Sequence, residues 1–266
     1  MTTNAKYRMI IKAILENGEE INTRNSKVLR NTNIKMSFKE TPLVTVRKTA
    51  WKNALREMEW FLSGSQEIGD LDERVRHWWT PWADSLGYIW NNYGKQFRRF
   101  EGRDYAQVDQ IQYMIDTLRD HPNSRRNVIT TWNTADMLNE MTPITNCHGT
   151  VIQAFVRHGK YLDLTMYQRS ADFMLGVQHN WIQYWALMNW LAHRADLKVG
   201  EFTWIGGDVH IYEDHIPVAK KIVEVDVNRS RPKMIYKPTS DEFKASDFTI
   251  ANIEEPVILD KVEMII

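Results

Sequence analysis

The sequence predicts an α+β fold, because segments with helical and strand periodicity follow one another in an irregular order. Helical segments at 5–17, 49–62 and 105–119 lie among strand-like segments, and a nearly all-apolar helix follows at 181–195. No Gly/Ser linker, low-complexity run or internal repeat divides the chain. We therefore expect residues 1–266 to form a single domain, with a mixed twisted sheet and flanking helices.

In the first half, residues 5–17 carry one apolar face and stop at Gly18, which predicts an amphipathic helix. Residues 21–48 are β-rich, with their clearest strand at 42–46. The helix at 49–62 ends at Gly64. Its expected core stripe consists of Trp51, Leu55, Met58 and Leu62.

In the second half, the helix at 105–119 leads into a basic turn at 123–126. Residues 151–157 and 161–167 alternate as strands do, and His158-Gly159-Lys160 between them predicts a hairpin. The segment 181–195 predicts a buried helix, and short strands with charged loops follow it.

Composition excludes several classes of protein. With 43% hydrophobic residues the chain can build a large core, but no stretch reaches the roughly 18 apolar residues of a transmembrane helix. The start of the chain lacks the apolar core of a signal peptide, and one cysteine cannot form an intramolecular disulfide, which is typical of a reducing cytoplasm. The 34 basic and 34 acidic residues cancel, so no overall charge favours a nucleic-acid polymer.

Cys147 is the only cysteine, and it precedes His148 just ahead of the hairpin at 151–167. Arg169 lies at the far end of that hairpin. The thiolate is the reactive form of cysteine, and a nearby guanidinium lowers the thiol pKa, so this pair predicts an activated nucleophile. The alternative for a lone cysteine is a small buried apolar side chain.

Glu57 has Ala54 and Phe61 as helical neighbours on the segment 49–62. A carboxyl group beside apolar side chains has a raised pKa and can exchange protons near neutrality. The alternative is an ordinary solvated acid, since acids are rarely buried.

Two further sets of residues are candidate ligand-binding groups. Guanidinium groups suit phosphate, and the candidates are Arg24, Arg125, Arg126 and Arg169, although each one alone also fits a solvated surface group. The strand at 206–212 carries His210 and Tyr212 on one face, which predicts donors for a sugar hydroxyl or, alternatively, a polar strand edge. No spacing of His, Cys and carboxylates predicts a metal site.

Several segments together resemble the thymidylate synthase family, which includes the phage deoxynucleotide hydroxymethylases. The matching segments are 49–52 with 57–64, 79–84, 93–96, 123–126, 147–148, 167–172, 175–176 and 207–212, in the family's order from about residue 5 to the C-terminus. The Gln-Arg-Ser-Xaa-Asp block at 168–172 with an upstream Cys-His is highly specific. The resemblance also implies that one face of the sheet forms a homodimer interface.

The resemblance implies a reaction. Cys147 would attack carbon 6 of dUMP and turn carbon 5 into a nucleophile, which would take a one-carbon unit from methylenetetrahydrofolate without a metal. Glu57 would organise protons and water at the ring, and Tyr93 would assist at carbon 5. The implied catalytic set is Cys147, Glu57, Asn180, Arg169, Tyr93 and Asp172.

The resemblance also implies binding residues. For the nucleotide these are Arg24, Gln168, Arg169, Ser170, Asn180, His210 and Tyr212, with Arg125 and Arg126 reaching the phosphate from the second subunit. For folate they are Trp79, Trp82, Asp172, Leu175, Gly176 and His179. Asn180 occupies the base-reading position, where the family's cytidylate hydroxymethylases carry aspartate, and its carboxamide matches the ring N–H and carbonyl of uracil.

Some positions depart from an ordinary synthase. Asn146, Asn92 and His179 place amides or an imidazole where synthases keep proline or phenylalanine near the reacting carbon. Polar groups that hold a water there favour hydration of the methylene intermediate over its reduction by hydride. We therefore favour a deoxyuridylate hydroxymethylase, acting in the cytoplasm of a phage-infected bacterium, over the alternative of a thymidylate synthase.

A non-catalytic relative that binds nucleotides or RNA is the alternative from a different class. The retention of Cys147 together with Glu57, Arg169 and Asn180 argues against it, because binding alone does not need the thiol. A flavin-dependent synthase is disfavoured, because its arginine-rich signature is absent.

Overall fold

The fold is organised around one mixed sheet of six strands, in the order β1-β2-β8-β7-β6-β5. This computed structural model describes residues 1–138, 146–226, 230–258 and 260–265. The strands are β1 (Glu19–Asn22), β2 (Lys27–Phe38), β5 (Val128–Thr130), β6 (Val151–Arg157), β7 (Tyr161–Asp172) and β8 (Lys198–Tyr212). Only the pairing of β7 with β8 is parallel, and the other pairs are antiparallel. The predicted α+β class is confirmed.

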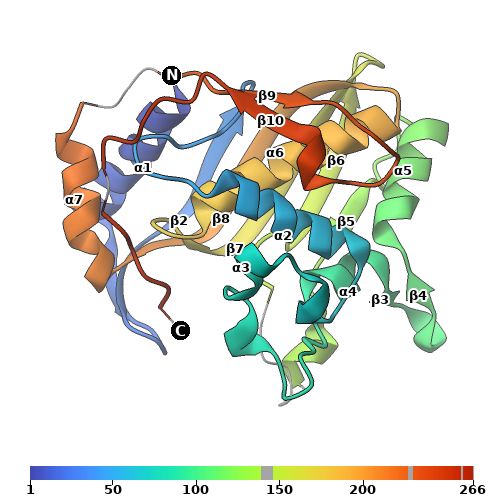
Figure 1. The fold of residues 1–266 in the computed structure, drawn as a ribbon, viewed down its shortest axis with the longest axis horizontal. Helices are drawn as coiled ribbons and strands as arrows, with labels where there is room; N and C mark the ends of the chain where they lie inside the picture. The colour runs from blue at the N-terminus through green and yellow to red at the C-terminus, as the bar shows by residue number, and fades with distance from the viewer. Residues whose placement is uncertain (139–145, 227–229, 259, 266) are drawn as a thin grey trace.

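Helix α6 (Val177–Arg194) is the central helix of the core and packs on β7 and β8 (Figure 1). Its Trp181 is fully buried and packs its ring against Phe38 of β2 and Trp204 of β8. Helix α2 (Trp51–Ser63) packs in turn on α6, and the antiparallel pair of β9 (Lys233–Tyr236) and β10 (Phe248–Ala251) lies beside these two helices. This layering buries any polar side chain that points from α6 toward α2 or toward the sheet.

The remaining elements flank this core (Figure 1). Helices α1 (Thr3–Asn17) and α7 (Ile216–Glu224) pack together beside β2 and β8. The others are α3 (Glu73–Arg76), α4 (Tyr93–Arg98), α5 (Gln110–Asp120), β3 (Phe100–Glu101) and β4 (Gln107–Val108). Short 3₁₀ turns occur at Ile68–Asp70, Thr80–Trp82, Arg103–Tyr105, Thr134–Leu138, Glu213–His215 and Ala245–Asp247.

Most predicted elements are confirmed, and the helix boundaries have identifiable causes. Helix α1 begins after Thr2, whose side chain accepts the backbone N–H of Ala5, and α2 ends where Gly64 turns to φ 78°. The predicted hairpin turn is present, with His158 and Gly159 both at positive φ. Three of the four residues in the expected stripe of α2 are buried, and Trp51 is half-buried.

The strand predicted at 42–46 is wrong. The segment is buried, but it pairs with no strand of the sheet. The side chain of Asn4 accepts the N–H groups of Thr45 and Val46, and the carbonyl of Val46 accepts the N–H groups of Val257 and Ile258. Hydrogen bonds to a helix side chain and to the C-terminal segment therefore replace a ladder.

Two predicted helix starts are also wrong. The helix predicted from residue 105 begins at Gln110, because the Asp109 side chain caps it by accepting the N–H of Gln112. Helix α6 begins four residues before 181, at Val177, because its first turn carries polar side chains that interrupt the apolar pattern. Asn180 is therefore a helix residue, and its side chain is buried.

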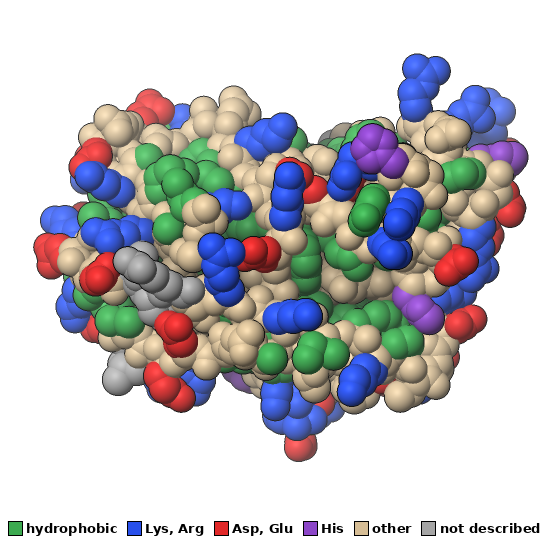
Figure 2. Space-filling model, turned by 90° about the horizontal axis from the view of Figure 1, so that it is seen from above, with side chains coloured by type: hydrophobic (Ala, Val, Ile, Leu, Met, Phe, Trp, Pro, Cys, Tyr) green, Lys and Arg blue, Asp and Glu red, His purple; other side chains and the backbone are tan. Residues whose placement is uncertain are grey.

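The charged side chains are mixed on the surface. Figure 2 shows basic and acidic side chains interspersed over the face of the molecule that it views. In the part of the chain that the structure describes, no helix is long and apolar enough to cross a membrane.

Candidate active site

Cys147 lies just before β6, where it meets α4 and β7. Its backbone N–H donates to the hydroxyl of Tyr93 at 2.8 Å, and its carbonyl accepts the N–H of Arg169 at 2.9 Å. The N–H of His148 also donates to the Tyr93 hydroxyl, at 3.3 Å. Because two backbone donors fill the acceptor positions of that oxygen, its own proton is directed at the sulfur of Cys147, 3.5 Å away. The structure thus joins two residues of the predicted catalytic set.

Burial raises the pKa of the Cys147 thiol above its ordinary value. The hydrogen bond from Tyr93 and the positive charge of Arg169 act in the opposite direction but do not outweigh it. The prediction of a thiol with a lowered pKa is therefore wrong for the free protein. The predicted influence of Arg169 has the right sign, and desolvation is the larger effect.

Arg169 is held in place by two neighbours. Its Nε–H donates to the carbonyl of Asn146 at 3.0 Å, and its guanidinium lies 5.1 Å from the centre of the Trp132 ring. The role of Trp132 was not predicted from the sequence. These contacts leave the guanidinium next to the cysteine loop, where a charged head group suits an anion.

Glu57 is buried on α2, which favours the raised-pKa alternative over the solvated acid that the sequence left open. One carboxylate oxygen accepts the indole N–H of Trp79 at 2.6 Å, and the other accepts the amide N–H of Gln183 at 2.5 Å. Burial raises the pKa of Glu57 to about 7, and the two hydrogen bonds limit that rise. The carboxyl group is therefore divided between its two protonation states near neutral pH.

Asn180 is joined to Glu57 through Gln183. The Asn180 amide donates to Gln183 at 3.1 Å, and its oxygen accepts the amide N–H of Gln168 at 3.0 Å. Gln168 accepts in turn the indole N–H of Trp204 at 3.0 Å. Gln183 and Trp204 were missed in the sequence analysis, although a glutamine within a helix predicted to be buried and apolar was a signal.

His148 is a structural residue in this arrangement. Its ring stacks on Tyr93 at 4.1 Å, and its Nδ1 lies 2.9 Å from the hydroxyl of Tyr184. Burial lowers its pKa to about 3, so the ring is neutral at physiological pH. The stacking fixes the Tyr93 ring that contacts Cys147.

The predicted nucleotide residues gather because β7 and β8 run parallel. Their register sets Ser170 beside Asp208 and Asp172 beside His210. The Nδ1 of His210 lies 2.7 Å from Asp208, which assigns its N–H to that carboxylate and leaves Nε2 for another partner. Tyr212 follows at the end of β8.

Within one chain, three of the arginines predicted to bind the phosphate lie on two separate turns. Arg24 is exposed on the β1–β2 turn, and the pairing of Val28 with Tyr212 brings that turn to the end of β8. Arg125 and Arg126 are exposed on the turn that follows α5. Their placement at a phosphate from a second subunit stays a prediction.

The predicted folate residues come from two segments that meet. Trp78 lies before the turn that holds Trp82, and its ring centre is 5.6 Å from that of His179 at the start of α6. Leu175 and Gly176 are half-buried on the turn before α6, and Asp172 accepts the N–H groups of Met174 and Leu175 in that turn. Trp79 is buried and supports Glu57, so its contact with folate stays a prediction.

Two of the three polar departures make structural hydrogen bonds through both ends of the side chain. Asn92 caps α4 by accepting the N–H of Lys95, and it donates to the carbonyl of Ser65. His179 donates from Nδ1 to Leu175 and accepts the N–H of Ala50 at Nε2, while burial lowers its pKa to about 4. The side-chain oxygen of Asn146 is buried and has no partner among the described residues.

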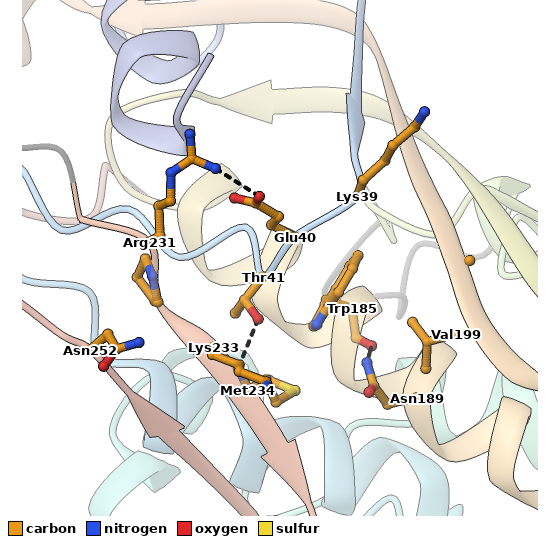
Figure 3. Close-up of a pocket in the computed structure, with 12 residues that line it drawn as sticks. Lys39, Glu40, Thr41, Trp185, Asn189, Val199, Arg231, Lys233, Met234 and Asn252 are labelled. Atoms are coloured by element: carbon orange, nitrogen blue, oxygen red, sulfur yellow. Dashed lines mark hydrogen bonds and ion pairs between the residues drawn. The ribbon is translucent and has the colours of Figure 1, made fainter.

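A cavity of about 470 Å³ lies away from these residues, between the end of β2, α6 and the β9 strand (Figure 3). It is lined by Lys39, Glu40, Thr41, Trp185, Asn189, Val199, Gly200, Arg231, Pro232, Lys233, Met234 and Asn252. None of the predicted site residues lines it. Within the described ranges, no group of three or more His, Cys, Asp or Glu could hold a metal ion.

Replacement of Tyr93 by Phe should raise the pKa of Cys147 further, because the hydrogen bond that stabilises its thiolate is lost. The pH dependence of iodoacetamide alkylation measures this shift directly, since the chain has one cysteine. Tyr184→Phe is the matched control, because it removes a hydroxyl that bonds to the ring of His148 rather than to the sulfur. Equal alkylation profiles for the wild type and Tyr93→Phe would contradict the assigned hydrogen bond.

Comparison with known proteins identifies the family. The family model for thymidylate synthase matches residues 5–264. The chain is 36% identical to the thymidylate synthase of Corynebacterium aurimucosum over 219 residues, which is 81% of this chain and 80% of that protein. It is 33% identical over 267 residues to the thymidylate synthase of Buchnera aphidicola subsp. Acyrthosiphon pisum (strain 5A), covering 97% of this chain and 99% of that protein. The chain therefore belongs to the thymidylate synthase family and is an enzyme, a transferase that uses methylenetetrahydrofolate as its co-substrate.

Proposed function

We propose that the protein is a thymidylate synthase, which converts dUMP and methylenetetrahydrofolate to dTMP and dihydrofolate. The observation that carries this proposal is the placement of Cys147 against Tyr93 and Arg169. Such a site suits covalent activation of a pyrimidine ring. The named relatives support the synthase over the hydroxymethylase that the polar departures first favoured.

Cys147 is proposed as the nucleophile for carbon 6 of the base. Its thiol is buried with a raised pKa, so it is stored mainly in the protonated form in the free protein. Tyr93 and Arg169 lower the pKa and stabilise the thiolate once the proton leaves. A neighbouring group that accepts protons near pH 7 is then needed, and Glu57 meets that condition.

The nucleotide is proposed to lie along the edge formed by β7 and β8. Arg169 and Ser170 would contact the phosphate, and the free Nε2 of His210 with the Tyr212 hydroxyl would meet the sugar. Asn180 would read the base from α6. On the other side, Trp82, Leu175 and Gly176 would hold folate beside Asp172, whose carboxyl pKa is raised by burial.

The engaged hydrogen bonds favour reduction of the methylene intermediate over its hydration. Both ring nitrogens of His179 are engaged, and the amide of Asn92 is already committed to the start of α4 and to Ser65. Of the three side chains, Asn146 is the one whose buried oxygen has no partner among the described residues. The unpartnered oxygen of Asn146 is the one observation that supports the hydroxymethylase as a second candidate.

A homodimer through the sheet is proposed from the face that points away from α6. The register aligns Val151, Tyr167 and Ile205 in one row across β6, β7 and β8. Val151 is 40% exposed and Phe155 is 43% exposed on the same face. Apolar side chains on an uncovered sheet face favour burial against an identical face, since a two-fold interface is self-complementary.

The product assay separates the two enzyme candidates. Incubation with dUMP and methylenetetrahydrofolate should give dTMP and dihydrofolate in equal amounts, identified by chromatography and by the absorbance of dihydrofolate. Hydroxymethyl-dUMP with tetrahydrofolate would overturn the synthase proposal in favour of the second candidate. Asn146→Pro removes the side-chain oxygen that has no partner in the described part of the chain. The product should stay the same if that oxygen has no influence on whether the methylene intermediate is reduced or hydrated.

Subunit complementation tests the shared phosphate site. Cys147→Ala subunits lack the nucleophile, and Arg126→Glu subunits place a negative charge where the partner's phosphate would bind. Mixed subunits should regain about a quarter to a half of the wild-type activity, because one of the two sites in each heterodimer has all its residues. An absence of recovery in heterodimers confirmed by mass spectrometry would count against a contribution from Arg126.

A further inference from the structure

A chain of side-chain hydrogen bonds crosses the buried side of the proposed base site. We name it the amide chain; it runs from Trp204 through Gln168, Asn180 and Gln183 to Glu57. The links measure 3.0, 3.0, 3.1 and 2.5 Å. Gln168, Asn180 and Gln183 are at most 6% exposed, so water does not compete for these bonds.

The direction of the amide chain is fixed at the Gln168 end. The indole N–H of Trp204 can only donate, and it meets the side-chain oxygen of Gln168. The backbone carbonyl of Ser170 can only accept, and it lies 3.1 Å from the side-chain nitrogen of Gln168. These two partners determine which end of the Gln168 amide faces Asn180, and that end is a donor.

The direction is fixed independently at the Gln183 end. The side-chain nitrogen of Gln183 lies 3.0 Å from the backbone carbonyl of Ala54 and donates to Glu57 as well. Its oxygen therefore faces Asn180 and accepts. Because Asn180 and Gln183 are three residues apart on α6, the helix itself holds them face to face.

Asn180 is thus placed between a donor and an acceptor that cannot exchange roles. Its oxygen must face Gln168 and its nitrogen must face Gln183. One lone pair of the oxygen and one N–H of the nitrogen remain for a ligand. Their order in space is set by the protein before any ligand arrives.

This order matters because an asparagine alone does not choose between the bases. Uracil presents a ring N–H and a carbonyl, whereas cytosine presents a ring nitrogen acceptor and an amino donor. An amide that rotates by 180° exchanges its donor with its acceptor and can pair with either base. Discrimination needs something that prevents the rotation.

We propose that Gln183 is a specificity-determining residue that, with Gln168, locks the Asn180 amide in the uracil-reading orientation and links it to Glu57. This inference rests on the proposed function and adds a residue that the family resemblance does not assign. Rotation of Asn180 in the intact chain would set donor against donor at Gln168 and acceptor against acceptor at Gln183. Both mismatches would be buried, where unsatisfied polar groups are costly.

The link to Glu57 gives the proposal a second consequence. The same nitrogen of Gln183 that orients the chain donates to the Glu57 carboxylate. Loss of this donor should move the pKa of Glu57 upward, because the hydrogen bond to Gln183 lowers it in the intact site. A residue with only a packing role would alter neither base selectivity nor this pKa.

Gln183→Met is the main test, because methionine keeps the length of the side chain and removes both the donor and the acceptor. One of the two mismatches that oppose rotation then disappears. The ratio of kcat/KM for dUMP to that for dCMP should fall by about tenfold or more, a shift of roughly 1.4 kcal/mol. The pH midpoint assigned to Glu57 should move to higher pH in the same variant.

Gln178→Met is the matched control. Gln178 lies on the same helix and is as buried as Gln183, but it is outside the amide chain. Its substitution should leave the base ratio unchanged. Equal effects of the two methionine variants would reduce Gln183 to a packing residue and overturn the proposal.

Gln183→Glu separates the two consequences. One oxygen of the new carboxyl group still accepts from Asn180, while the other faces two acceptors, the Ala54 carbonyl and Glu57, and must hold a proton. This variant should keep the preference for dUMP and alter the pH profile. Loss of the preference in Gln183→Glu would contradict the orientation argument.

Nucleotide binding keeps the test independent of turnover. Calorimetric titration of wild type and of both Gln183 variants with dUMP and with dCMP should show the same change in base preference. If the wild type binds dUMP but makes no dTMP, the proposed function is contradicted and this inference is not. If the wild type makes dTMP and Gln183→Met keeps the wild-type preference for dUMP over dCMP, the inference is contradicted and the proposed function is not.

Discussion

The burial of Glu57 is the constraint on which the rest of the site depends. A carboxyl group beneath α6 is stable only if donors reach it, and the structure supplies Trp79 from one side and Gln183 from the other. The hydrogen bond from Trp79 holds the segment that carries this tryptophan against α2. The Gln183 contact places α6 so that Asn180 faces the proposed base site. The acid–base role proposed for Glu57 and the base recognition proposed for Asn180 therefore depend on the same buried hydrogen bonds.

The thiol shows how two opposing effects are balanced in one site. Burial disfavours the thiolate of Cys147, and Tyr93 and Arg169 favour it, with burial the stronger in the free protein. Sequence alone showed only the favourable partner, because the neighbourhood of an arginine is visible in a motif and desolvation is not. His148, stacked on Tyr93 and bonded to Tyr184, holds the hydroxyl that contacts the sulfur.

Elements with a strong hydrophobic periodicity could be predicted from the sequence, whereas the burial of polar side chains could not. The hairpin of β6 and β7 and the helix α1 followed from alternation and from an apolar face. The segment 42–46 was misassigned because its backbone is satisfied by Asn4, a contact between distant residues. The start of α6 was missed for a related reason, since His179 and Asn180 in its polar first turn bond to Ala50 and Gln168, which are distant in the sequence. Gln183 was not identified from the sequence because its importance lies in three partners, Asn180 on its own helix and Ala54 and Glu57 on α2.

The central claim is that Cys147 adds covalently to the pyrimidine and so activates carbon 5. Exchange of the carbon-5 hydrogen tests this step most directly, because only attack at carbon 6 makes that hydrogen labile. Wild type incubated with dUMP carrying tritium at carbon 5, together with methylenetetrahydrofolate, should release tritium to water. Cys147→Ala should release none above the uncatalysed rate while still binding dUMP. Release by Cys147→Ala at a rate near that of wild type would contradict the account.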